Sequence, residues 1–193
     1  MELADSALSV TKEQGFPVWA ALMTILRGWS LAEQGDRSGG LSELHRGLAA
    51  YRSTGAEVAE TYLLSLLAEA EVAVGHPNRA VATVDQALLV VARQGVRCWE
   101  PELHRLKGQA LLQRERAHAR AAEDSFRKAI EVAQEQEAKS WELRAATSLA
   151  RLWAEWGKRA QSRDLLAPVY GWFTEGFDTA DLKDAEALLD ELR

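Results

Sequence analysis

Few residues of this chain have the types and spacing that metal binding requires. The four histidines, His45, His76, His104 and His118, show no paired ligand spacing on a helix face. The single Cys98 cannot complete a zinc site, which draws four ligands mainly from Cys and His. We therefore expect no metal site, and we interpret Cys98 as a half-buried, inert thiol.

The nearest match to a phosphate-binding loop runs from Gly35 to Ser42. Such a loop needs a lysine before its Ser or Thr, and Leu41 stands at that place. We interpret the segment as a turn between two helices and expect no nucleotide or other cofactor. Glu69 and Glu71 are two residues apart and would face different directions on a helix. Nothing in the spacing predicts a catalytic residue, although a Ser-His-Asp site assembles from distant residues, so we expect a chain that is not an enzyme.

The composition indicates an all-α protein. Of 193 residues, 33 are Ala and 27 are Leu, against 12 Val, 2 Ile and 8 Thr. This balance favours helices over strands. A net charge of -6 and a pI near 5.3 argue against a nucleic-acid partner. No apolar run reaches the ~20 residues of a membrane span, no signal segment opens the chain, and one cysteine fits a reducing compartment, so we expect a cytoplasmic protein without a membrane partner.

A repeat of about 40 residues runs through the chain. Glycines recur 40 apart at 15, 55 and 95, and a second series contains 35, 75 and 157. Glycine is favoured just past helix ends because it adopts the left-handed conformation at little cost. Small residues also recur, at Gly28, Ala68, Gly108 and Ala150 and at Gly40, Ala80, Ala122 and Ser162. We expect these pairs to let the two helices of each repeat approach closely, beside the larger Leu44, Val84, Phe126 and Leu166. Two extra residues fall between Glu115 and Ala121, which predicts a lengthened loop there.

The expected helices cover 17–34, 38–53, 56–74, 77–93, 99–114, 118–136, 138–156 and 159–175, with a last helix from Asp178 or Thr179 to about 192. Pro168 falls inside the eighth of these, where it should kink or break the helix. The chain then forms one domain, 1–193, with a lone second helix (1–15), four repeats (16–55, 56–95, 96–137, 138–176) and a capping helix (177–193).

Helical hairpins with small residues at their crossings resemble the tetratricopeptide repeat, here elongated from its standard 34 residues. The predicted fold is a right-handed α-α superhelix of tetratricopeptide-like hairpins with a C-terminal capping helix. A compact helical bundle is the alternative. Because residues 1–14 align with 41–54 and 81–94, the chain opens in the middle of a repeat. We therefore expect the C-terminal end of a longer array.

Four phrases carry a more specific resemblance. They span 20–29, 102–108, 139–153 and 170–183, of which the last, Tyr170-Gly-Trp-Phe-Thr-Glu-Gly-Phe-Asp-Thr-Ala-Asp-Leu-Lys183, is the most specific. These phrases resemble the C-terminal tetratricopeptide-like region of large bacterial signalling ATPases, often fused to class III adenylate or guanylate cyclase domains. The resemblance covers nearly the whole chain. It implies a regulatory or scaffolding segment downstream of catalytic domains.

A partner would bind on the concave surface that the first helices of successive repeats line. Relative to the small residues of the first series, we expect the residues six before, three before and one after to point into it. That choice gives Leu22, Ile25, Trp29, Tyr62, Ser65, Glu69, Glu102, Arg105, Gln109, Arg144, Thr147 and Arg151. Aromatic residues are common interface anchors, and arginines suit carboxylates or phosphates. The predicted groove residues are Trp29, Tyr62, Glu69, Glu102, Arg105, Gln109, Arg144 and Arg151.

Two classes of function fit these residues. The first is a non-catalytic module that binds a protein or peptide, or a second copy of itself. The alternative is a sensor in which an anionic metabolite binds Arg105, Arg144 and Arg151 and controls an upstream ATPase or cyclase. The arginines can also pair only with nearby groups such as Glu102, Gln109 and Glu155. Trp99 and Trp141 hold equivalent positions, Trp19 shares their register, and all three are expected to pack between adjacent repeats. The six acids of the last helix region (Asp178, Asp181, Asp184, Glu186, Asp190 and Glu191) are expected to form its solvated outer face.

Overall fold

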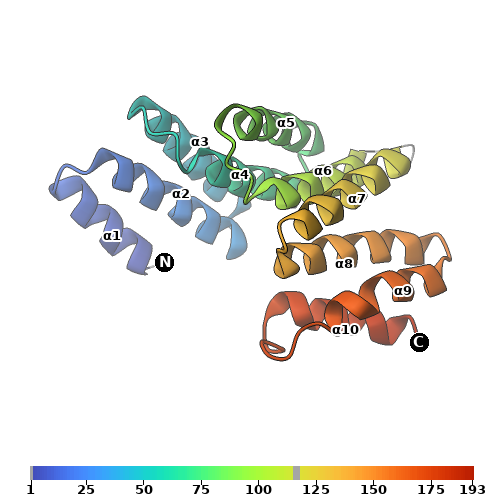
Figure 1. Cartoon of the computed structure of the whole chain (residues 1–193). Helices are drawn as coiled ribbons and strands as arrows, with labels where there is room; N and C mark the ends of the chain where they lie inside the picture. The colour runs from blue at the N-terminus through green and yellow to red at the C-terminus, as the bar shows by residue number, and fades with distance from the viewer. Residues whose placement is uncertain (1, 115–117) are drawn as a thin grey trace. The chain divides into compact units, whose positions relative to one another are not determined.

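The computed structural model describes residues 2–114 and 118–193, and these residues form ten α-helices and no strand (Figure 1). The helices are α1 (Glu2–Glu13), α2 (Pro17–Glu33), α3 (Arg37–Ser53), α4 (Glu60–Val74), α5 (Pro77–Gln94), α6 (Glu100–Arg114), α7 (Ala119–Glu135), α8 (Lys139–Glu155), α9 (Arg159–Tyr170) and α10 (Ala180–Glu191). The predicted all-α class and helical hairpins are confirmed. The loop expected between 115 and 121 lies partly outside the described residues.

The chain divides into two compact units, residues 1–97 and 98–193. The first unit, blue to green in Figure 1, contains α1 to α5, with the hairpins α2–α3 and α4–α5 and with α1 packed on α2. The second, green to red, contains the hairpins α6–α7 and α8–α9. Its last helix, α10, packs on both α8 and α9.

Small residues bring the two helices of a hairpin into backbone contact. A Cβ atom on Gly28 of α2 would lie 2.8 Å from the Gly40 carbonyl oxygen and 2.8 Å from the Leu44 nitrogen of α3. A Cβ on Gly108 of α6 would lie 2.4 Å from the ring of Phe126 on α7. The four larger residues predicted beside the crossings, Leu44, Val84, Phe126 and Leu166, are completely buried. Each such side chain contributes about 1.5–3 kcal/mol through burial, so the hairpins are held by the residues that the repeat predicted.

The ends of two helices differ from the prediction. The helix expected to begin at 56 begins at Glu60, because the Tyr51 hydroxyl accepts a 3.0 Å hydrogen bond from the Ala59 N–H and holds residues 57–59 in a turn. The helix expected to reach 175 ends at Tyr170. Pro168 has no N–H to donate to the preceding turn, and the helix stops two residues later. The glycines predicted past helix ends are confirmed there: Gly75 and Gly95 cap α4 and α5 with φ of 82° and 72°.

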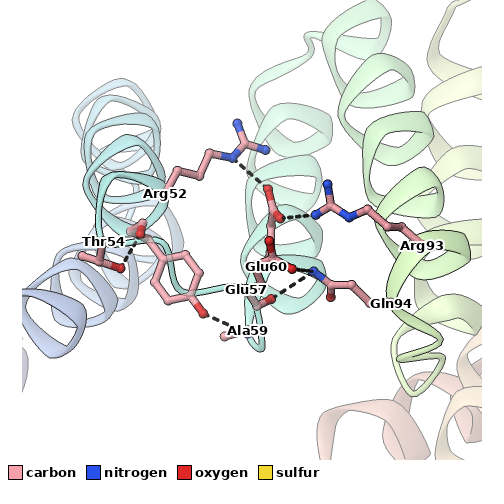
Figure 2. Close-up of polar contacts among 8 residues, drawn as sticks. Arg52, Thr54, Glu57, Ala59, Glu60, Arg93 and Gln94 are labelled. Carbon is pink, nitrogen blue, oxygen red and sulfur yellow. Dashed lines mark hydrogen bonds and ion pairs between the residues drawn. The ribbon is translucent and has the colours of Figure 1, made fainter.

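One buried carboxylate joins three helices of the first unit (Figure 2). Glu60, in the first turn of α4, accepts a 2.8 Å hydrogen bond from Arg52 Nε of α3. Its second oxygen lies 3.5 Å from Arg93 Nη2 of α5. In the second unit, Glu142 stands in the first turn of α8 and accepts a 2.8 Å hydrogen bond from Gln134, again eight residues earlier. A glutamate at this position thus ties the first helix of a hairpin to the helix before it.

Candidate functional site: the arginine cavity

The predicted groove residues fall into two sets, one in each unit. In the first unit, Trp29 Nε1 of α2 donates a 3.1 Å hydrogen bond to Glu69 Oε2 of α4. Tyr62 lies half-buried on the same helix as Glu69, and burial and the Glu69 carboxylate raise the pKa of its phenol. The structure therefore brings Trp29 and Glu69 together across two helices.

In the second unit, the predicted Arg105, Gln109, Arg144 and Arg151 meet at one cavity of about 120 Å³, which we call the arginine cavity. Its lining residues come from three helices: Arg105 and Gln109 from α6, Arg144, Thr147, Ser148 and Arg151 from α8, and Asp181 and Asp184 from α10. α8 contributes four of them because residues three, four and seven apart share one helix face.

Arg105 lines the arginine cavity, whereas the predicted groove residue Glu102 does not and is buried as its ion-pair partner. Arg105 Nε and Nη2 each donate a 2.7 Å hydrogen bond to one oxygen of the Glu102 carboxylate. Both side chains are less than a tenth exposed. Arg144 Nη2 lies 3.2 Å from Glu102 Oε1, so the carboxylate serves two guanidinium groups. A bidentate pair of this kind fixes the orientation of both groups, and the same carboxylate also holds Arg144.

The rim of the arginine cavity consists of two ion pairs between α8 and α10. Arg151 Nη2 lies 2.8 Å from Asp184 Oδ1, and Arg144 Nε lies 3.6 Å from Asp181 Oδ1. All four side chains remain a quarter to a half exposed. Asp181 and Asp184 are exposed, as expected of a solvated face, but they also pair with arginines of α8, which the interpretation as an outer face did not include. They flank the apolar face that seats α10, and this places them beside the arginines of α8.

Two tryptophans that do not line the cavity connect to it through Arg144. The Arg144 guanidinium carbon lies 5.4 Å from the centre of the Trp141 ring, within the range of a cation–π interaction. Trp141 packs edge-on against Trp99, with their ring centres 5.4 Å apart. The expectation of packing between adjacent repeats is confirmed for Trp99 and Trp141, and Trp141 also contacts a cavity arginine. It is wrong for Trp19, which is 57% exposed.

The lining suits polar recognition more than bond-making chemistry. The hydroxyl groups of Thr147 and Ser148 donate to the Leu143 and Arg144 carbonyls of their own helix, at 2.8 and 2.9 Å. The three arginines balance Glu102, Asp181 and Asp184 in formal charge. The cavity therefore offers fixed positive groups, but each stands next to a carboxylate.

Sequence reasoning missed Ser148, Asp181 and Asp184 as lining residues. The spacing of Asp181 and Asp184, three apart, shows that they share a helix face, but it does not show that this face meets α8. The sequence suggested Glu155, a neighbour on α8, as a partner of Arg151, whereas the structure pairs Arg151 with Asp184.

The other residues considered for chemistry lie away from the arginine cavity. Within 2–114 and 118–193, no group of three or more His, Cys, Asp or Glu residues could hold a metal ion. Cys98 is exposed rather than half-buried, because it lies in the turn before α6. The segment from Gly35 forms a turn and the start of α3, where the Asp36 carboxylate accepts a hydrogen bond from the Gly39 N–H. In the described part of the chain, no helix has the length and apolar character to cross a bilayer.

Comparison with known proteins places the fold among tetratricopeptide-like repeats. Two crystal structures of nearly identical TPR-like repeats of a kinesin light chain-like protein from Podosopora anserina, one of them carrying a single substitution, superpose with TM-scores of 0.66 and 0.65. They are 15% and 14% identical to this chain, cover 88% of it, and are themselves covered to 82% and 83%. At that identity the likeness concerns the fold. No protein-family profile and no curated protein matches the sequence.

Proposed function

We propose that this chain is a non-catalytic protein-interaction module that holds an acidic segment of a partner protein at the arginine cavity. The observation that carries the proposal is the cluster of Arg105, Arg144 and Arg151 on two helices of one unit. Arg105 and Arg144 both pair with the buried Glu102 carboxylate, and Arg151 pairs with Asp184 at the surface. A planar guanidinium group suits carboxylate recognition, and Arg144 and Arg151 are the more exposed of the three.

The fold supports this proposal. Stacked helical hairpins create extended concave surfaces that bind other chains. Aromatic residues on such a surface act as anchors, and in the first unit Trp29 and Tyr62 are only half-buried. A protein or peptide partner is therefore the ligand class that the lining favours, and a second copy of the chain is a particular case of it.

We further propose that the chain is the regulatory C-terminal part of a larger cytoplasmic signalling protein. The sequence phrases at 102–108, 139–153 and 170–183 support this context through their resemblance to signalling ATPases and cyclase fusions. The sequence of the complete gene tests it directly. Catalytic ATPase or cyclase domains upstream of this segment are the expected result, and a gene without them contradicts the proposal.

Binding of a fluorescein-labelled hexaglutamate peptide tests the module itself. Arg144→Gln/Arg151→Gln should weaken binding at least about tenfold, since a hydrogen bond to a charged group is worth about 1.5–3 kcal/mol. The exposed Arg120→Gln/Arg163→Gln pair provides a charge-matched control in the same unit. Equal losses in both variants would contradict a role for the cavity.

A small anionic metabolite is the second candidate, and the modest volume of about 120 Å³ favours it. Thermal unfolding in the presence of metabolite anions and of acidic peptides separates the two, because a ligand stabilises the folded state it binds. Stabilisation by a metabolite but not by peptides would favour the sensor.

A further inference from the structure

The two carboxylates of α10 occupy the rim arginines at the place where a partner's carboxylates would bind. We propose that Asp181 and Asp184 act as a tethered competitor, which makes the arginine cavity selective for partners that carry at least two negative groups. This inference rests on the proposed function, because it concerns the regulation of the same cavity. Its physical basis is the pairing of Asp184 with Arg151 at 2.8 Å and of Asp181 with Arg144 at 3.6 Å.

A partner can replace these carboxylates without moving α10. The helix is held by its apolar face, where Leu182, Ala185 and Leu188 are buried against the rest of the unit. At its far end, Arg159 of α9 donates to the Glu191 carbonyl. Burial of a leucine contributes more than a half-exposed ion pair does. The rim pairs can therefore open while α10 stays in place.

The buried Glu102–Arg105 pair stays intact while the two rim ion pairs exchange. Glu102 keeps both of its hydrogen bonds to Arg105, so that arginine is already neutralised and buried. Arg144 and Arg151 are 26% and 49% exposed and can turn toward an incoming group. The exchange therefore concerns these two arginines and the two aspartates.

Tethering sets the requirement for two charges. Asp181 and Asp184 are part of the same chain, so they act at a high effective concentration without a cost of association. They are three residues apart on α10, which places their side chains roughly 5–6 Å from each other at Cβ. A partner with one carboxylate replaces one of the two rim pairs. It then lies next to the displaced aspartate and to the intact second pair, and both aspartates still compete with it. A partner with two carboxylates at a similar separation replaces both pairs together.

Neutralising the tethered carboxylates tests this inference in the full chain. Asp181→Asn/Asp184→Asn keeps the size of both side chains and removes their charge. The matched control is Asp178→Asn/Asp190→Asn, which changes the net charge equally at two positions in and next to the same helix that do not line the cavity. The probe is fluorescein-labelled hexaglutamate, with hexaglutamine as the neutral peptide, and circular dichroism checks that each variant keeps its helices.

The expected result is roughly 2- to 30-fold tighter binding of hexaglutamate by Asp181→Asn/Asp184→Asn than by the unmodified chain. The control variant should bind as the unmodified chain does. An equal gain in both variants, or no gain in either, overturns the tethered competitor. If, in addition, Arg144→Gln/Arg151→Gln still weakens binding, the proposed function stands without it. If hexaglutamate binds none of these proteins, both the competitor and the proposed cavity are overturned.

Discussion

Substitution of Gly28 by alanine should destabilise the hairpin α2–α3 although alanine is the better helix former. The new methyl group would lie 2.8 Å from Gly40 O and Leu44 N, both backbone atoms of α3, and 2.8 Å from the Glu43 Cβ. Ordinary contacts begin near 3.4 Å, so the two helices must move apart by roughly 0.6 Å along their crossing. Backbone atoms cannot turn aside as a flexible side chain does.

The size of the effect follows from two opposing contributions. Overpacking of this kind costs about 1–3 kcal/mol, and the backbone nature of the clash places it in the upper part of that range. Alanine recovers about 1 kcal/mol of helix propensity relative to glycine. The free energy of unfolding should therefore fall by about 1–2 kcal/mol.

Urea unfolding followed by circular dichroism measures this change. The reverse substitution at an exposed position of the same hairpin, Ala49→Gly, calibrates the helix-propensity contribution, which should be a loss of about 1 kcal/mol. If Gly28→Ala is as stable as the unmodified chain or more stable, close backbone approach does not determine the packing of this hairpin. That result would refute the packing role inferred for the 40-residue series of small residues.

Three further predictions test other contacts. Burial raises the pKa of the Glu71 carboxyl above its ordinary value of 4.5, although the Thr83 hydrogen bond and nearby cations lower it in part. The folded protein therefore favours the neutral carboxyl, and it loses stability as pH rises from 4.5 through the raised pKa of the folded state. Glu71→Gln should therefore increase the free energy of unfolding at pH 7 but change it less at pH 4, and equal changes at both would contradict the assignment. Glu60→Ala should lower the free energy of unfolding by about 1–3 kcal/mol, because the carboxylate joins α3, α4 and α5. A loss no larger than that of Glu131→Ala, at an exposed position, would contradict this role of Glu60. A double-mutant cycle of Trp99→Ala and Trp141→Ala, measured by urea unfolding, should give a coupling free energy of about 0.5–1.5 kcal/mol. A coupling near zero would show that the contact between the two rings does not stabilise the fold.

Much of the fold could be predicted because it is repeated. Each small residue of the first series recurs at an equivalent place in the next hairpin, and backbone contact at Gly28 or ring contact at Gly108 is the physical reason. The errors lie at helix ends. The late start of α4 depends on the Tyr51 hydroxyl reaching Ala59, a contact that spacing alone does not reveal.

The candidate site could be predicted only in part, for a reason visible at one position of the repeat. The residues three before the small residue were expected to face the groove, but Ile25, Ser65, Arg105 and Thr147 are all less than a tenth exposed. Arg105 is tolerated among them because Glu102 neutralises it. The contribution of α10 could not be predicted, because that helix does not belong to the repeat and its position depends on packing against α8 and α9.

The exposed and the buried ion pairs at the arginine cavity respond differently to added salt. The Debye length falls from about 10 Å at 0.1 M to about 3 Å at 1 M, and ions screen exposed charges far more than buried ones. The Arg151–Asp184 pair at the surface would loosen as ionic strength rises, while the buried Glu102–Arg105 pair keeps its geometry. Salt then weakens both the acidic partner and the aspartates that compete with it, so the affinity of the cavity should depend on ionic strength less steeply than its number of arginines suggests.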